Sequence, residues 1–295
     1  MSERTIAEWL SRIDKDARQA RNERIFDLWM ACHTQEEIAE RENVTQSVVS
    51  DNLSEMADLP KSINSAKGAA EHITDFEPPI YNIWKEQERQ KQADHFGNTH
   101  LRWLDNLLYL YTKPYDIVVD PFAGGGSTID ICKKRFRRYW VSDRKPIVER
   151  EKEIRQHDVM DGIPRLPSWK DVKLVYLDPP YWKQAEGEYS NDPEDLANMS
   201  LDDFNKSLAS IINGFADKLT DAYIALIIQP TQWRSPDRKY VDHVMDMCRT
   251  VNLPVDMRFS TPYESQQYNA QMVNWAKDSK KCLVLTREIV VWKIS

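Results

Sequence analysis

From residue 116 onward, the sequence alternates between short apolar runs and segments whose apolar residues recur at helical spacing. Runs of this length predict buried strands, and the segments between them predict helices. The expected strands are 116–119, 138–141, 172–177, 222–228, 282–285 and 289–294, and the expected helices are 127–136, 201–219 and one that begins at Leu101 and is stopped by Pro114. This alternation predicts an α/β fold with a Rossmann-like, doubly wound sheet, in which ligands collect at the carboxyl ends of the strands.

Residues 1–75 lack the alternation and show a helical pattern throughout. We therefore predict two domains, a small all-helical domain at 1–75 and an α/β domain at 76–295, with the boundary near Pro78 and Pro79. A chain of 295 residues is long enough for both.

Within the helical domain, residues 35–53 resemble a helix-turn-helix. Asn43 falls in the turn, where a left-handed backbone is needed, and Thr45 can cap the second helix. Side chains able to reach base edges would lie on the outward face of that helix: Gln46, Ser47 and Ser50. Because this face carries no Lys or Arg, two uses stay open, namely DNA reading, or dimerisation and packing on the α/β domain.

Charge and cysteine content narrow the class of protein. The formal net charge is −7, so any nucleic-acid contact, which rewards positive surface, has to be local. Basic residues cluster at 133–138, 234–239 and 280–281. Cys32, Cys132, Cys248 and Cys282 lack paired spacing, which predicts buried thiols, with neither a metal site nor a disulfide framework.

No apolar stretch approaches the length that a bilayer requires, and the beginning of the chain is a charged helical pattern instead of a leader peptide. We therefore expect no membrane contact. The expected location is the cytoplasm, of a bacterium or of a phage-infected host cell.

A glycine-rich loop follows the first expected strand. It comprises Asp120, Pro121, Phe122, Ala123, Gly124, Gly125, Gly126, Ser127 and Thr128. Its first and last glycines let the backbone approach a ligand closely, and Ser127 or Thr128 can cap the following helix. Asp143 ends the second strand, where an acid holds ribose hydroxyls in dinucleotide-binding folds. The same geometry suits S-adenosylmethionine.

Asp178, Pro179, Pro180 and Tyr181 close the apolar run 172–177. An exocyclic amine of adenine or cytosine is a poor nucleophile, because its lone pair is delocalised into the ring. The Asp178 carboxylate and the Pro179 carbonyl could accept its two N–H bonds and oppose that delocalisation, and proline has no N–H to compete. Tyr181 offers a flat face on which a base can stack. The motif therefore predicts methyl transfer to such an amine; the alternative is a strand-end acid beside a core aromatic.

The glycine loop and the Asp-Pro-Pro-Tyr motif together resemble the amino-methyltransferases of DNA, over about residues 95–295. The resemblance implies that the loop surrounds S-adenosylmethionine, with Phe122 packed beside it. It further implies that Asp143 binds the ribose and Asp158 the adenine of that cofactor. The residues implied to flank its methionine carboxylate are Asn98, Thr99 and His100.

The substrate implied by the resemblance is double-stranded DNA, with the target base flipped out of the stack. Tyr181, together with Trp182, would receive the base, and the polar segment 183–200 would form a mobile flap. The side chains expected to face nucleic acid are Trp233, Arg234, Arg238 and Lys239. The full-length pattern is also similar to phage and mobile-element proteins whose longer relatives carry a partition-protein-like (ParB-like) front half. A homodimer is compatible with it.

The motif begins with Asp, and in this it is more similar to the motif of enzymes that act on adenine N6 than to that of enzymes that act on cytosine N4. Cytosine N4 stays the alternative target. A DNA-binding regulator with an inactive methylase domain is a second hypothesis, against which the intact Asp178 and Tyr181 argue. A third is methylation of RNA or of a protein amide. The helical domain disfavours it, as does Asp178, since amide methylases commonly have Asn there.

Overall fold

The computed structural model describes residues 3–65, 75–85, 99–184, 187, 191–232, 239–262 and 268–295. Its centre is a seven-stranded sheet of order β3-β2-β1-β4-β5-β9-β8. The strands are β1 Ile117–Asp120, β2 Arg138–Asp143, β3 Arg155–Gln156, β4 Val172–Leu177, β5 Ala222–Ile228, β8 Val255–Pro262 and β9 Thr286–Ile294. The first five run parallel, β9 is antiparallel to β5, and β8 is antiparallel to β9. This is the Rossmann-like α/β fold that the sequence predicts. Two further short strands, β6 Thr231–Gln232 and β7 Tyr240–Val241, pair with each other.

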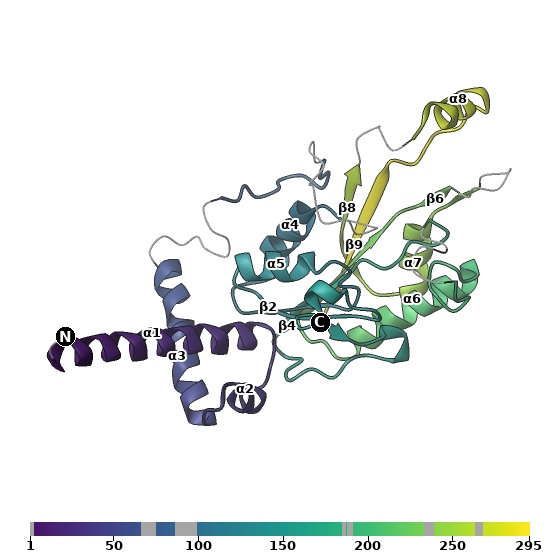
Figure 1. The fold of residues 1–295 in the computed structure, drawn as a ribbon. Coiled ribbons are helices and arrows are strands. Elements are labelled where there is room, and N and C mark those ends of the chain that lie inside the picture. The colour runs from purple at the N-terminus through teal and green to yellow at the C-terminus, as the bar shows by residue number, and fades with distance from the viewer. Residues whose placement is uncertain are drawn as a thin grey trace.

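Helices cover both faces of the sheet (Figure 1). They are α4 Leu101–Tyr111, α5 Ser127–Lys134, α6 Leu201–Ala216 and α7 His243–Val251, with α8 Ala270–Asp278 further along and the short 3-10 turns η1 Val148–Arg150 and η2 Val159–Asp161. Apolar side chains of α4 and α5 pack with Val118, Leu174 and Ile227 on one face. Those of α6 and α7 pack with alternate residues of the same strands on the other face. Strands buried on both faces need continuous apolar runs, which explains why 172–177 and 222–228 were predicted with their observed bounds.

The carboxyl-terminal strands differ from the prediction. Residues 282–285 form no strand, and β8, which the sequence analysis did not predict, pairs with β9 instead. The reason is that β8 lies at the edge of the sheet and exposes most of its first half, where Asp256 and Arg258 interrupt the apolar pattern. An edge strand of this kind lacks the apolar run that a buried strand has.

The helical domain consists of α1 Glu3–Met30, α2 Gln35–Glu42 and α3 Gln46–Ser65. Asn43 adopts the expected left-handed backbone, with a φ of 51°, and the backbone N–H of Val48 donates to the Thr45 hydroxyl. Ile38, Val49 and Leu53 form a small buried core, to which α1 adds Ile25. Glu42 forms an ion pair with Arg24 of α1, at 2.8 Å. The turn geometry is thus confirmed, whereas DNA reading by α3 stays a prediction.

Backbone carbonyls at the end of α1 join the helical domain to the sheet. Arg138 of β2 donates to the Trp29 carbonyl at 3.2 Å, and its guanidinium lies over the Trp29 ring. Arg155 of β3 donates to the Ala31 carbonyl at 2.7 Å. Cys32 is buried against the sheet and Cys132 under it, as predicted, but Cys282 is exposed, so that part of the thiol prediction is wrong.

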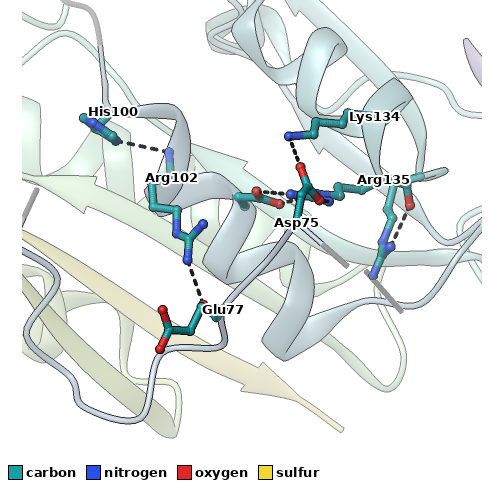
Figure 2. Close-up of polar contacts among 8 residues, drawn as sticks. Asp75, Glu77, His100, Arg102, Lys134 and Arg135 are labelled. Atoms are coloured by element: carbon teal, nitrogen blue, oxygen red, sulfur yellow. Dashed lines mark hydrogen bonds and ion pairs between the residues drawn. The ribbon is translucent and has the colours of Figure 1, made fainter. Parts of the chain in front are cut away.

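Residues 75–85 form a strap between the α4–α5 layer and the β8 edge. Figure 2 shows Asp75 beside Lys134 and Arg135, each at 2.6 Å, and Arg102 donating to the Glu77 carbonyl. At the other end of the strap, the Trp84 ring stacks on Phe259 with centroids 4.0 Å apart. The strap therefore runs from the α4–α5 layer to the edge strand β8.

Two arginines of the basic cluster 133–138 are buried, so this cluster does not form the continuous surface patch considered above. Arg135 makes a two-pronged ion pair with the buried Asp105, at 2.7 and 2.6 Å. Arg137 donates to the Thr112 hydroxyl and to backbone carbonyls. None of the helices in the described part of the chain is long and apolar enough to span a membrane.

Loss of one partner of the Arg135–Asp105 pair should destabilise the fold. Asp105→Asn leaves the buried Arg135 guanidinium with only the half-exposed Asp75 as a counter-charge, and we expect a loss of about 3–5 kcal/mol in the free energy of unfolding. Asp75→Asn removes the other carboxylate on Arg135, and because the Asp75 side chain is 48% exposed, the loss should be much smaller. Urea denaturation measures both losses. Equal losses in the two variants would contradict the conclusion that Asp105 is the main counter-charge of the buried Arg135.

Candidate active site

Three acidic residues at the carboxyl ends of parallel strands lie along one edge of the sheet. Asp120 ends β1, Asp143 ends β2, and Asp178 follows β4. Because β1 pairs with both β2 and β4, the three strand ends are neighbours. The strand order reverses between β1 and β4, which is where Rossmann-like sheets bind ligands. The two sequence motifs therefore meet at one site.

Asp120 holds the glycine loop in shape from inside the protein. Its carboxylate accepts hydrogen bonds from the Phe122 backbone N–H at 2.9 Å and from the Thr128 hydroxyl at 2.5 Å. Burial raises the pKa of Asp120 to about 7, and the nearby charges of Asp178 and Asp143 add to the effect, while the two hydrogen bonds oppose it. Asp120 was predicted to bind a cofactor, but its carboxylate is turned to the loop itself.

The backbone of the loop uses its glycines as expected. Gly124 and Gly126 have left-handed backbones, with φ of 47° and 78°. The Gly124 N–H donates to the Asp143 carboxylate at 3.0 Å, which ties the loop to the end of β2. The predicted capping of α5 is wrong, because Gly126 is the N-cap residue and makes no side-chain bond, and the Thr128 hydroxyl donates to Asp120 instead.

Arg150, which the sequence analysis did not single out, closes one side of the loop. It donates to the Gly126 carbonyl at 2.9 Å and to both carboxylate oxygens of Asp130 in α5. A Cβ atom at position 126 would lie 3.0 Å from the Arg150 side chain, so glycine is needed there for space as well as for its φ. A lone arginine in a charged segment gave no signal of this contact.

Asp178 lies partly exposed at the mouth of β4, where two hydroxyl groups donate to its carboxylate. Thr99 donates to one oxygen, and Tyr181 donates to the other at 2.9 Å. Burial strongly raises the pKa of Tyr181, so its hydroxyl stays protonated and able to donate. Desolvation also raises the pKa of Asp178, while the charge of Arg287 and the bonds from Thr99 and Tyr181 oppose that rise.

Arg287, at the start of β9, completes this cluster and was missed in the sequence. It donates to the Thr99 hydroxyl at 2.8 Å, and its guanidinium lies 5.0 Å from the centre of the Tyr181 ring. Its neighbour Glu288 is buried and accepts from Arg258 and Ser260 of β8. Arg287 and Glu288 directly precede the apolar run 289–292. Charged residues at the start of a buried strand need partners, and this was the sequence signal that could have identified Arg287.

The residues that follow Asp178 differ in their burial: some lie at the candidate active site and others in the core. Pro179 is buried, and Pro180 and Tyr181 are partly exposed. Trp182 was expected to receive a base, but it is buried in the core, and its indole N–H donates to the Met199 carbonyl at 2.9 Å. The chain turns after β4, and the two side chains pack on different faces of the sheet: Trp182 on the α6–α7 side and Tyr181 on the α4–α5 side. The prediction for Trp182 is wrong.

Two predicted cofactor acids lie at successive strand ends. The Asp143 carboxylate accepts from the Gly124 and Lys145 backbone N–H groups. Asp158 lies beyond β3 and accepts from the Met160 N–H, at the start of a short 3-10 turn. His100 is the N-cap residue of α4 and accepts from the Arg102 N–H. These bonds place the three residues at the site edge and leave their cofactor contacts as predictions.

Only some of the residues expected to face DNA lie in the described part of the chain. Gln46, Ser47 and Ser50 are exposed on α3, and the Gln46 amide donates to Glu36 at 2.9 Å. Lys239 is exposed next to β7. The other residues expected to face DNA lie outside the described part of the chain: Trp233, Arg234 and Arg238. Asn98, which was predicted to flank the methionine carboxylate of the cofactor, also lies outside it.

The segment predicted to be a mobile flap is anchored over its described second half. Leu196 and Ala197 are buried in the core, and Lys183 donates its backbone N–H to the Ala197 carbonyl. The buried Asp195 accepts from Arg144, the residue after Asp143, at 3.1 Å. Residues 191–199 are therefore packed against the core next to the end of β2, and the prediction of a mobile flap is wrong for them.

This geometry agrees with a comparison of the sequence with protein families. Residues 8–149 match the DNA methylase family. The match to the DNA methylases includes the helical domain, Thr99 and the glycine loop, and it ends before Asp178. The assignment of the Asp-Pro-Pro-Tyr motif thus depends on the sequence and on the geometry described above. No curated protein is significantly similar in sequence.

Solved structures with a similar fold are methyltransferases of several kinds. A SAM-dependent methyltransferase from Archaeoglobus fulgidus is 12% identical, with a TM-score of 0.40, over 66% of this chain and 94% of that one. A 1,6-didemethyltoxoflavin-N1-methyltransferase from Burkholderia thailandensis is 12% identical, with a TM-score of 0.35, over 62% and 72%. An rRNA methylase from Streptococcus thermophilus is also 12% identical, with a TM-score of 0.33, over 61% and 89%. Likenesses this distant do not bear on the substrate.

The buried Asp120 should make the fold less stable as the pH rises. Its folded-state pKa of about 7 lies above the ordinary value of 3.8, so between these values the folded chain keeps a proton that the unfolded chain releases. The contribution of Asp120 to stability is therefore present at about pH 4 and is lost by about pH 7. Asp120→Asn should lessen that loss, measured by urea denaturation across the window.

The matched control is Asp221→Asn, the same chemical change at an exposed position, which should leave the pH dependence as in the wild type. If Asp120→Asn and the wild type lost the same free energy of unfolding across the window, the buried carboxyl would not be the titrating group.

Proposed function

We propose that this protein transfers a methyl group from S-adenosylmethionine to the exocyclic amine of a base in double-stranded DNA, with adenine N6 as the first candidate. The observation that carries the proposal is the Asp178 carboxylate at the mouth of β4, next to the glycine loop that ends β1. The match of residues 8–149 to the DNA methylases supports DNA as the substrate. S-adenosylmethionine supplies an electrophilic methyl group on a sulfonium.

The residues around the glycine loop fit this cofactor chemically. Gly124, Gly125 and Gly126 have no side chains, so a ligand can approach the main chain of the loop closely. Asp143 and Asp158, at the ends of β2 and β3, offer acceptor oxygens for ribose hydroxyls and for an adenine amine. Phe122 is partly exposed in the same loop and offers an apolar contact.

Asp178 would act as the acceptor that orients the target amine. Its two oxygens already take hydrogen bonds from Thr99 and Tyr181, so an incoming N–H group would replace one of these donors. The carboxylate would also stabilise the positive charge that grows on nitrogen as the new N–C bond forms and the S–C bond breaks. The amine then loses a proton to solvent, and S-adenosylhomocysteine leaves.

Tyr181 would provide the stacking surface for the extruded base. One face of its ring is covered by the Arg287 guanidinium, so the base would use the opposite face. Arg287 would hold Tyr181 and Thr99 in position, and its charge would oppose the rise that burial causes in the pKa of Asp178. We propose it as a positioning residue, since its contacts are to these two side chains.

The alternatives differ in substrate or in activity. Cytosine N4 is the runner-up target, and a regulator that binds DNA and cofactor without transfer is the second alternative. The exposed α3 side chains Gln46, Ser47 and Ser50 support DNA reading by the helical domain, whereas the absence of basic residues on that face favours a dimerisation role. A bacterial or phage-infected host cytoplasm remains the proposed location.

Asp178→Asn tests the proposal. The amide keeps the shape of the side chain but cannot accept at both atoms or balance a positive charge, so methyl transfer to DNA should fall by at least about a thousandfold. Binding of S-adenosylmethionine, measured by calorimetry, should stay within about threefold, because the glycine loop and Asp143 are unchanged. The readout is mass spectrometry of nucleosides from duplex DNA after incubation with methyl-labelled cofactor, which also identifies the base.

Undiminished transfer by the variant would rule out the role of Asp178. Label that appears in RNA or protein and not in DNA would redirect the substrate. Cofactor binding by the wild type without label in any polymer would favour the regulator.

Arg287→Gln should shift the acid side of the pH–rate profile. Removing the positive charge that opposes the raised pKa of Asp178 lets that pKa rise further, so kcat/KM should begin to fall at a higher pH than in the wild type. Arg287→Lys keeps the charge and should leave the acid limb near its wild-type position, although kcat falls. If the acid limb of the pH–rate profile were the same in Arg287→Gln and in the wild type, Arg287 would act only on the fold.

A further inference from the structure

The segment 268–285, here called the carboxyl-terminal arm, leaves the sheet at the edge that carries the candidate active site. Pro262, the last residue of β8, pairs with Thr286, the first residue of β9. Glu288 of β9 in turn pairs with Ile228, the carboxyl end of β5. The arm therefore joins β9 at the carboxyl edge of the parallel strands, and its last residue, Leu285, is two positions before Arg287, which contacts Thr99.

The arm is an ordered element that buries little of itself. Asn269 caps α8 by accepting from the Met272 N–H at 2.9 Å, and the Tyr268 hydroxyl donates to the Val284 carbonyl at 2.6 Å, which closes the arm on itself. Within α8 only Ala276 is buried. Figure 1 shows α8 at the tip of the arm, beyond the body of the sheet. Most of the α8 surface is therefore accessible to another molecule.

The exposed charge of the arm is positive on an acidic chain. Lys277, Lys280 and Lys281 are exposed, and Asp278 is the one acidic residue among 268–285, whereas the whole chain has a formal net charge of −7. The Lys281 ammonium lies 5.9 Å from the centre of the Trp275 ring, so an aromatic surface accompanies the charge. A local cationic surface attracts a polyanion through counterion release even when the protein as a whole is negative.

We propose that the carboxyl-terminal arm binds the sugar–phosphate backbone of duplex DNA beside the candidate active site, with Lys277, Lys280 and Lys281 as the phosphate contacts. The inference rests on the proposed function, and it names the surface that holds the substrate. Backbone contacts near the site would hold the duplex while the target base turns out toward Asp178. A basic surface at this edge also reconciles the acidic chain with a nucleic-acid substrate.

The test compares two triple variants with equal loss of charge. The first is Lys277→Gln, Lys280→Gln and Lys281→Gln. The control is Lys113→Gln, Lys170→Gln and Lys218→Gln, three exposed lysines that precede β1, β4 and β5 and so lie at the opposite edge of the sheet. Binding of a fluorescent random-sequence duplex is followed by anisotropy over a range of NaCl concentrations, and cofactor binding by calorimetry confirms that each variant is folded.

At physiological salt, the arm variant should bind the duplex about tenfold or more weakly than the wild type. The slope of log Kd against log salt concentration should also decrease, by about 0.9 for each lost phosphate contact. The control variant should lose less than about threefold in affinity, and cofactor affinity should be unchanged in both. KM for duplex DNA should rise in the arm variant while kcat changes little, because the chemistry at Asp178 is untouched.

An arm variant with wild-type affinity and salt dependence would overturn this inference and leave the proposed function standing, provided that the wild type methylates DNA. A wild type that neither binds nor methylates a duplex would overturn both. If sedimentation shows a dimer that the arm substitutions dissociate, with DNA affinity unchanged, the arm is an interface between two copies of the chain and the inference is wrong.

Discussion

The arrangement of the candidate active site depends on a chain of hydrogen bonds from Arg287 through Thr99 to Asp178. The three residues come from the segment before α4, the end of β4 and the start of β9, so the bonds form only when the sheet is complete. The same arginine covers one face of Tyr181. Folding thereby fixes both the acceptor carboxylate and the aromatic ring, which is the preorganisation that a methyl acceptor site requires.

A second group of buried bonds holds the glycine loop at the same edge. Asp120 fixes the loop through Phe122 and Thr128, while Asp143 fixes it through Gly124. Burial raises the pKa of Asp120, and the nearby charge of Asp143 adds to the rise, a perturbation that is common at functional sites. The two groups of bonds together bring a cofactor loop and a catalytic motif to one end of the sheet.

The sequence alone predicted the elements whose signal is local and left out those that depend on contacts across the fold. The strands 172–177 and 222–228 were found because both faces are buried, whereas β8 was missed because an edge strand needs no apolar run. The Asp178 motif is contiguous and was found. Arg287 was missed because its partners are far away in the sequence, and Trp182 was misassigned because its burial depends on a distant partner, the Met199 carbonyl.

The most direct test of the central claim is a crystal structure of the protein with S-adenosylhomocysteine and a duplex that contains the methylated base. The account predicts that the sulfur lies by the glycine loop and that the exocyclic nitrogen is within hydrogen-bond distance of the Asp178 carboxylate, with the Thr99 or the Tyr181 hydroxyl displaced. A cofactor bound away from the loop, or a base held out of reach while both hydroxyls still donate to Asp178, would contradict it.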